Sequence, residues 1–257
     1  QYHFKTTSNL KRRRDFMNGA FSVAKIHKPK EGLTVSTSAG ITSETRITWF
    51  SLGAGTDISA ETYDTPVIYI GMGGNGRFVT SNKNTCKKVG VSNVSNKVSN
   101  EVSNEVSNEE TGKILGTGDV LIIQPGTLSG TETEDGFVYG EIMPMEAINM
   151  NNLVKPGEVF NLAGLLPYED GSIVNMDVAS NDAMKFVLMS FDQGTGLSAH
   201  RAPGDALVFA LEGKAIIGYE GQDYPIEAGQ TFRFEKNGLH SVTADGKFKM
   251  ALLLTLK

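Results

Sequence analysis

The chain contains one sequence pattern twice, and this duplication constrains its fold more than any other feature. Placing Phe21 on Phe160 aligns residues 21–74 with residues 160–213 without a gap. Apolar positions coincide along most of this stretch. Identical pairs include Phe21/Phe160, Ala24/Ala163, Gly55/Gly194 and Gly74/Gly213. Two copies of one domain therefore account for nearly the whole chain.

Beyond residue 74 the two copies still align, but equivalent residues are then fewer positions apart in the chain than before. Gly118 then matches Gly229, and Phe137 matches Phe248. The two shifts differ because the first copy contains an insertion, which we place at residues 83–110. Five Val-Ser-Asn units lie inside it, and their Ser and Asn side chains disfavour a helix. We expect a mobile surface loop there, because a core does not accommodate such an insertion; a binding segment is the alternative.

The second copy shows the spacing of a β protein. Gly213, Gly221 and Gly229 are eight residues apart, and short runs of strand-forming residues lie between them. No long helical stripe of apolar residues is present. Short strands at this spacing, separated by glycine turns, predict an all-β sandwich or barrel.

Composition excludes several classes of protein. The net charge of -5 gives no reason to expect nucleic acid as a partner, and no apolar run is long enough for a membrane span. The single cysteine, Cys86, excludes an intrachain disulfide. Without an apolar segment after the basic N-terminal residues, we expect a cytoplasmic protein.

Two segments of the second copy resemble the motifs of the cupin family. The segment from Gly194 to Gly213 resembles the first motif, G(X)5HXH(X)3–4E(X)6G, with His200 at the first histidine position. The segment from Gly229 to His240 resembles the second, G(X)5PXG(X)2H. It departs from that motif at two positions, Glu235 for Pro and Asn237 for Gly. The resemblance implies a bicupin, with two tandem double-stranded β-helix (jelly-roll) barrels.

The resemblance also implies where a metal would bind. Cupins usually hold a metal with two His and one Glu from the first motif and one His from the second. Here His200 and His240 are present, but Ala202 and Ala206 occupy the other two positions. The set is incomplete, although a divalent metal such as Zn, Fe, Mn or Ni at the two histidines stays an alternative. Asp205 has the wrong strand parity to join them and, like Arg201, is expected to face outward or line the rim.

The first copy has no histidine at these four positions, which are Glu61, Tyr63, Val67 and Ser129. It therefore cannot carry the same chemistry as the second copy. We interpret it as a structural partner or as a differently specialised pocket.

Three functions remain open for the chain. The first is binding of a small polar or anionic molecule, such as a sugar or organic acid, at His200 and His240. The second is a metal-dependent cupin enzyme of the isomerase, lyase or oxygenase type. The third is a structural or storage-type bicupin, in which the two histidines are ordinary hydrogen-bonded residues. A monomer and a homodimer both fit a chain that can pair its two barrels internally.

The predicted domain organisation follows from the duplication. Residues 18–143 form the N-terminal barrel and residues 156–257 the C-terminal barrel, joined by a linker at 144–155. Residues 1–17 form a basic leader that we expect to be flexible. A targeting segment or an anion-binding tail is the alternative for this leader.

The insertion provides a first test. Deleting residues 83–110 should leave the melting temperature nearly unchanged, because a surface loop contributes little burial. Thermal unfolding followed by circular dichroism measures this, with the undeleted chain as the reference. A drop of many degrees would show that the segment is a packed element.

Overall fold

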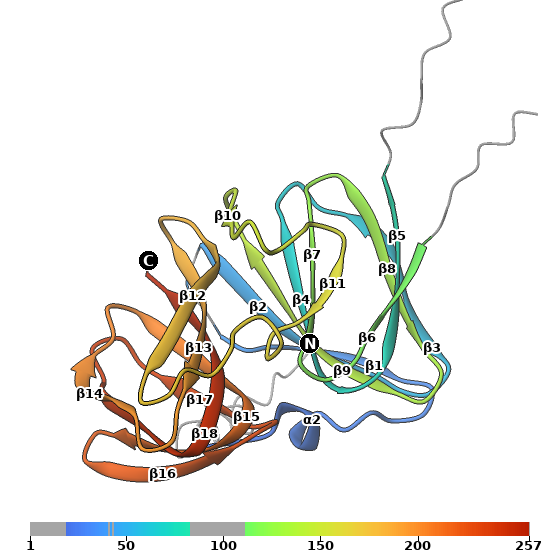
Figure 1. The fold of residues 1–257 in the computed structure, drawn as a ribbon. Helices are drawn as coiled ribbons and strands as arrows, with labels where there is room; N and C mark the ends of the chain where they lie inside the picture. Colours follow the sequence, from blue (N-terminus) through green and yellow to red (C-terminus); the bar gives the residue numbers. More distant parts are fainter. Residues whose placement is uncertain (1–18, 41, 43, 83–110, 257) are drawn as a thin grey trace, which may run out of the picture.

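A computed structural model of the chain describes residues 19–40, 42, 44–82 and 111–256. Two β-barrels lie side by side, the first in blue to yellow-green and the second in orange to red (Figure 1). The predicted all-β fold with two tandem barrels is therefore confirmed. The predicted leader and the predicted loop at 83–110 lie outside the described residues.

The first barrel is formed by two sheets. One has the strand order β1-β2-β9-β4-β7-β11 and the other the order β3-β8-β5-β6. Apolar side chains from both sheets meet in its interior, among them Tyr69, Phe78 and Tyr139. The strands are β1 (Thr34–Ser38), β2 (Thr45–Leu52), β3 (Thr56–Thr62), β4 (Val67–Gly74), β5 (Gly76–Asn82), β6 (Thr111–Leu115), β7 (Asp119–Ile123), β8 (Thr127–Thr133), β9 (Phe137–Pro144) and β11 (Val159–Asn161).

In the second barrel, the two long strands β15 and β18 join into one sheet what are two separate sheets in the first barrel. Because β15 and β18 are continuous, the strands join in the order β10-β12-β13-β18-β15-β16, with β14 paired to β18 and β17 paired to β15. The strands are β10 (Asn149–Met150), β12 (Ile173–Ser180), β13 (Met184–Phe191), β14 (Gly196–Arg201), β15 (Asp205–Tyr219), β16 (Gln222–Glu227), β17 (Thr231–Phe234) and β18 (Leu239–Thr255).

The strand registers of the two barrels are the same. Residue pairs in one barrel correspond to residue pairs in the other at the two shifts found in the sequence, which confirms both alignments. A slip of one residue would have exchanged the inward and outward faces of a strand. Corresponding pairs include Ile47–Ile142 with Phe186–Leu253, Ile68–Ile122 with Leu207–Arg233, and Glu61–Ser129 with His200–His240.

Each copy extends its first segment onto the other barrel. Phe21 pairs with Thr231 of β17, through backbone hydrogen bonds of 2.9 and 2.6 Å. The equivalent Phe160, in β11, pairs with Val120 of β7. The short helix α2 (Val23–Ile26) follows Phe21, and its Val23 is fully buried. This reciprocal exchange is what an approximate twofold relation between two copies requires.

The largest apolar cluster lies between the barrels rather than inside either one. It contains side chains from β2, β4 and β9 of the first barrel and from β13, β15 and β18 of the second. Trp49 of β2 meets Phe209 of β15 edge to face, with ring centroids 6.3 Å apart. Of these strands, β9 is buried at every position and therefore on both of its faces.

The predicted domain boundaries stay predictions. β10 lies within the predicted linker and pairs with β12, whereas β11 belongs to the second copy by sequence but pairs with β7 of the first barrel. No helix among the described residues is long and apolar enough to cross a membrane.

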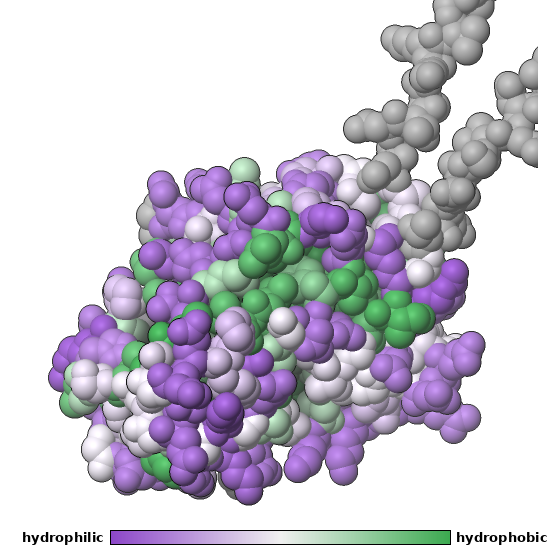
Figure 2. Space-filling model, in the orientation of Figure 1, coloured by the Kyte–Doolittle hydropathy of each residue, from purple (hydrophilic) through white to green (hydrophobic). Residues whose placement is uncertain are grey.

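An apolar band remains at the surface. Figure 2 shows it across the middle of this face, over the region of β11 and β6. Near these strands, Ile114 of β6 is 59% exposed and Leu153, before β11, is 66% exposed. Exposed apolar surface often marks an interaction site. Whether the protein is a monomer or a homodimer stays a prediction.

A glycine within β15 has the same backbone conformation as its equivalent in the first barrel, and a substitution can test whether that glycine is required. Gly213 has a φ of 72°, and a Cβ there would lie 1.9 Å from the carbonyl oxygen of Lys247. Its equivalent, Gly74, has a φ of 73° and a similar close contact. We expect Gly213→Ala to lower the free energy of unfolding by about 3 kcal/mol, from the left-handed backbone and the clash together.

Gly221→Ala is the matched control for this variant. Gly221 also has a positive φ, of 82°, but a Cβ there meets nothing within 4 Å. Its variant should lose only about 1 kcal/mol, which is the cost of the backbone conformation alone. Urea unfolding of both variants measures the difference. Equal losses would contradict the proposed clash at Gly213.

Candidate functional site

The two predicted site histidines lie next to each other. His200 of β14 and His240 of β18 are direct partners in an antiparallel strand pair. Their ring centroids are 4.2 Å apart, at an interplanar angle of 52°. A bulge in β14, between Leu197 and His200, sets this register, and β3 of the first barrel has its bulge at the equivalent place.

The two rings differ in their exposure. His240 is 7% exposed, whereas His200 is exposed to solvent. The His200 ring is therefore open to solvent rather than enclosed in the barrel. It lies on β14, which pairs only with β18 in this sheet and so leaves one side of the strand open. The pair extends from the solvent towards the barrel interior.

Backbone carbonyls orient both imidazoles. Nδ1 of His200 lies 2.8 Å from the carbonyl oxygen of Ser198, and Nδ1 of His240 lies 3.1 Å from that of Gly238. A carbonyl oxygen only accepts hydrogen bonds, so each Nδ1 carries the proton and donates it. In the neutral rings, each Nε2 then has a free lone pair. The histidines therefore present two hydrogen-bond acceptors.

Aromatic residues surround the buried ring. Phe234 of β17 stacks on His240, with centroids 4.1 Å apart and an interplanar angle of 28°. Tyr219 of β15 is the partner of His240 across the β15–β18 pair, and its ring lies 5.5 Å from that of Phe234. The Tyr219 hydroxyl accepts a hydrogen bond from the backbone N–H of Glu235, and burial raises its pKa. These rings form an apolar wall beside the imidazole of His240.

The environment of His240 keeps its ring neutral. Burial lowers the pKa of His240 because the imidazolium form loses hydration, and the neighbouring His200 lowers it further. The hydrogen bond to Gly238 opposes these effects only in part. At neutral pH the His240 ring is therefore uncharged, and its Nε2 is a hydrogen-bond acceptor.

The residues around the histidines do not complete a metal centre. Ala202 and Ala206, at the two other positions of the cupin pattern, are both buried and carry no ligand atom. Among the described residues, no group of three His, Cys, Asp or Glu side chains could hold a metal ion. Two imidazoles fall short of the three or four protein ligands that metal sites use.

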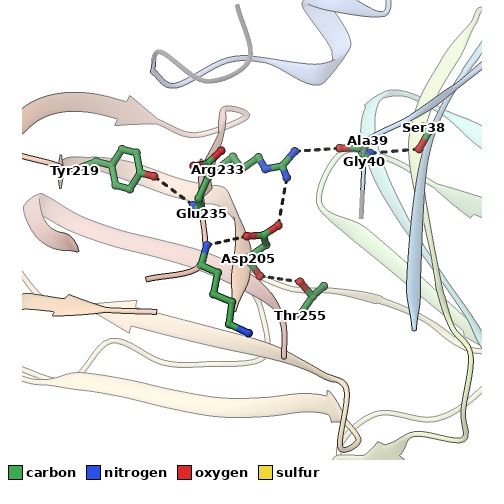
Figure 3. Close-up of polar contacts among 9 residues, drawn as sticks. Ser38, Ala39, Gly40, Asp205, Tyr219, Arg233, Glu235 and Thr255 are labelled. Carbon is green, nitrogen blue, oxygen red and sulfur yellow. Dashed lines mark hydrogen bonds and ion pairs between the residues drawn. The ribbon is translucent and has the colours of Figure 1, made fainter. Parts of the chain in front are cut away.

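Asp205 has another role than metal binding (Figure 3). Its carboxylate accepts a hydrogen bond from the backbone N–H of Lys236 at 2.7 Å and lies 3.4 Å from the guanidinium of Arg233. Arg233 also donates to the carbonyl oxygen of Ala39 in the first barrel. Through Arg233, Asp205 contributes to a contact between the barrels.

Arg201 and Asn237 shape the backbone beside the pair. Arg201, exposed as expected, donates a hydrogen bond to the carbonyl oxygen of Asn237. Asn237, which replaces the inner glycine of the second motif, has a φ of 65°. Asparagine tolerates this left-handed conformation better than most residues do. The departure from the motif therefore preserves the turn that leads into β18.

The equivalent positions of the first barrel carry a different set of side chains. Glu61 of β3 is the partner of Ser129 of β8, as His200 is of His240. Tyr63 donates a hydrogen bond of 3.4 Å to the Glu61 carboxylate, and burial raises the pKa of Tyr63 to about 12. Val67 is fully buried. The first barrel thus has a carboxylate and a hydroxyl in place of the two histidines, and a tyrosine and a valine in place of the two alanines.

Sequence reasoning missed one buried carboxyl in this barrel. Glu141 of β9 is 5% exposed, and its equivalent in the second copy is Leu252. Inward-facing Tyr139 and Met143 lie two residues to either side of it. The available signal was a carboxylate at an inward position of an otherwise apolar strand.

Comparison with known proteins agrees with this architecture. Residues 187–256 match the Cupin domain family. The second barrel is a cupin domain. No curated protein matches the sequence. A solved structure of a Cupin 2 conserved barrel domain protein from Leptotrichia buccalis is similar over 93% of this chain and 97% of its own, with a TM-score of 0.74 and 24% identity.

A second solved structure extends the similarity to a named enzyme. Oxalate decarboxylase from Bacillus subtilis is similar over 93% of this chain and 76% of its own, with a TM-score of 0.51 and 12% identity. At these identities the likeness concerns the fold, which is that of a bicupin. The chemistry of the cupin domain has to be argued from its own residues.

The contact between the two histidines predicts that His200 affects the pKa of His240. We expect His200→Asn to raise the pKa of His240, because the variant removes a neighbouring group whose charge lowers that pKa. An NMR titration of the His240 ring proton measures it. Arg201→Gln is the control, since Arg201 is not among the groups that shift the pKa of His240, and it should change nothing. A pKa that falls or stays the same in His200→Asn would contradict the coupling.

Proposed function

We propose that the second barrel binds a small polar or anionic molecule at His200 and His240. The observation that carries this proposal is the orientation of both rings. Their Nδ1 protons are held by backbone carbonyls, so both Nε2 atoms are left to contact a ligand. Rings 4.2 Å apart on paired strands can reach one small molecule together.

The protonation state defines the ligand chemistry. The Nε2 of a neutral imidazole, the form that the environment of His240 favours, accepts a hydrogen bond and suits a ligand with hydroxyl groups, such as a sugar. A weak organic acid suits the pair as well, because its proton can move to one Nε2 and leave the carboxylate beside an imidazolium. The stacked Phe234 and nearby Tyr219 offer an apolar surface to the carbon skeleton of such a ligand.

The alternative is a metal-dependent cupin enzyme of the isomerase, lyase or oxygenase type. The Nδ1 contacts of both rings favour it, because metal-binding histidines are commonly held through Nδ1 by a backbone carbonyl. The lack of a third ligand among the described residues opposes it. A structural or storage role without any site is the remaining alternative.

Binding to the histidine nitrogens tests the proposal. Protein labelled with ¹⁵N in histidine is titrated with glucose and, separately, with glycolic acid, while the Nε2 resonances are followed by NMR. We expect a saturable shift of both Nε2 resonances with at least one of these probes. The double variant His200→Ala/His240→Ala should lower the affinity at least tenfold, as measured by calorimetry.

A matched control uses the equivalent pair of the first barrel. Glu61→Ala/Ser129→Ala changes the same two strand positions and should leave this binding unchanged. Near-ultraviolet circular dichroism confirms that each variant is folded. Stoichiometric Zn, Fe, Mn or Ni in the purified protein, lost in the histidine double variant, would replace the proposal by the metal enzyme. Absence of both metal and probe binding would favour the structural role.

A further inference from the structure

The interior of the first barrel contains a carboxyl group that its fold does not use. Glu141 lies on the same face of β9 as Phe137, Tyr139 and Met143, all of which belong to the apolar core of the barrel. It is 5% exposed and forms no hydrogen bond or ion pair with any residue in the described part of the chain. A buried carboxyl without a partner is costly, and such groups cluster at functional sites.

The groups facing Glu141 come from three neighbouring strands and one loop. On its own sheet, Tyr69 of β4 and Thr48 of β2 are its direct strand partners. The Tyr69 hydroxyl lies 3.4 Å from the Ser129 hydroxyl in the opposite sheet. Glu61 of β3 and Tyr63, which follows that strand, complete the polar set and lead towards the solvent.

Arg46 is the cationic group that acts on Glu141, but it does not pair with it. Its guanidinium contacts the sulfur of Met143 and forms no salt bridge with a described carboxylate. Burial raises the pKa of Glu141 to about 7, an effect that Arg46 opposes and Glu61 reinforces. Near neutral pH the carboxyl group is thus close to half ionised, and a ligand can change its charge.

We propose that the first barrel holds a second binding site, for a small organic cation such as a protonated amine, between Glu141, Glu61, Tyr63 and Tyr69. An ammonium group has only hydrogen-bond donors, and two carboxylates and two phenol oxygens provide the matching acceptors. This site is separate from the histidine pair, which lies in the other barrel.

The walls of the site favour an organic cation over a metal ion. Tyr69, Phe78 and Tyr139 pack around the polar group, with ring centroids 4.6 to 5.9 Å apart. Aromatic faces attract ammonium groups and contact the carbon atoms that they carry. The two carboxylates are too few for a hard metal ion, and no group of three metal-binding side chains occurs in the described residues.

The pH dependence of amine binding tests this site. The full chain is titrated calorimetrically with ethylammonium and with benzylammonium at pH 6 and pH 8. With a pKa of about 7, Glu141 is roughly one tenth ionised at pH 6 and nine tenths ionised at pH 8, while both amines remain protonated. The affinity should therefore rise about tenfold over this interval. Ethanol and benzyl alcohol, the neutral probes, should not bind.

Single substitutions test whether the pH-dependent amine binding occurs at Glu141 and Glu61. Glu141→Gln keeps the shape of the side chain and should remove the pH dependence along with most of the affinity. Glu61→Gln, at the exposed end of the cluster, should weaken binding several-fold and leaves the interior of the barrel unchanged. Glu132→Gln removes an exposed carboxylate that pairs with Arg77 in the same barrel, and it should have no effect.

Three results would overturn the proposal. The first is that neither amine shows saturable binding. The second is that Glu141→Gln and Glu61→Gln both bind as the unchanged chain does. The third is that Mn²⁺ binds and displaces the amine, which would assign the site to a metal. The His200→Ala/His240→Ala variant should bind the amines normally, so this test is independent of the function proposed for the second barrel.

Discussion

The packing of the two barrels against each other is the contact on which the rest of the structure depends. The outer faces of β2, β4 and β9 meet those of β13, β15 and β18 in one apolar cluster. As a result these strands have a barrel core on one side and the partner barrel on the other. β9 is buried at all eight of its positions. The exchange of Phe21 and Phe160 between the barrels adds backbone hydrogen bonds to this apolar contact.

Within this common framework the two interiors have diverged. The backbones share their registers, their bulges and their glycine bends, so equivalent positions present side chains in the same way. One barrel has His200 beside His240, and the other has Glu61 beside Ser129. The difference between Leu252 and Glu141 is larger still, because it exchanges an apolar group for a titratable one inside a barrel. Duplication thus allowed one stable fold to carry two chemically different interiors.

Much of the fold was predictable because the repeat is long and its apolar pattern is regular. The two alignment shifts matched the equivalent strands correctly. The site was predictable only in part. The approach of His200 to His240 followed from the resemblance to cupins, whereas the exposure of His200 depends on the free side of β14. Glu141 was missed because local sequence does not show which neighbours leave a carboxyl group unpaired.

By itself the sequence determined the duplication, the β architecture and the side chains at each equivalent position, because these depend on periodicity and spacing along the chain. The tertiary structure alone decided how the copies exchange their first segments and which imidazole nitrogens are free. It also decided that Glu141 is buried without a partner while Asp205 is held by Arg233. Hydration and electrostatic interactions depend on distances through space between residues far apart in the chain. They are therefore set only when the two barrels have closed and packed together.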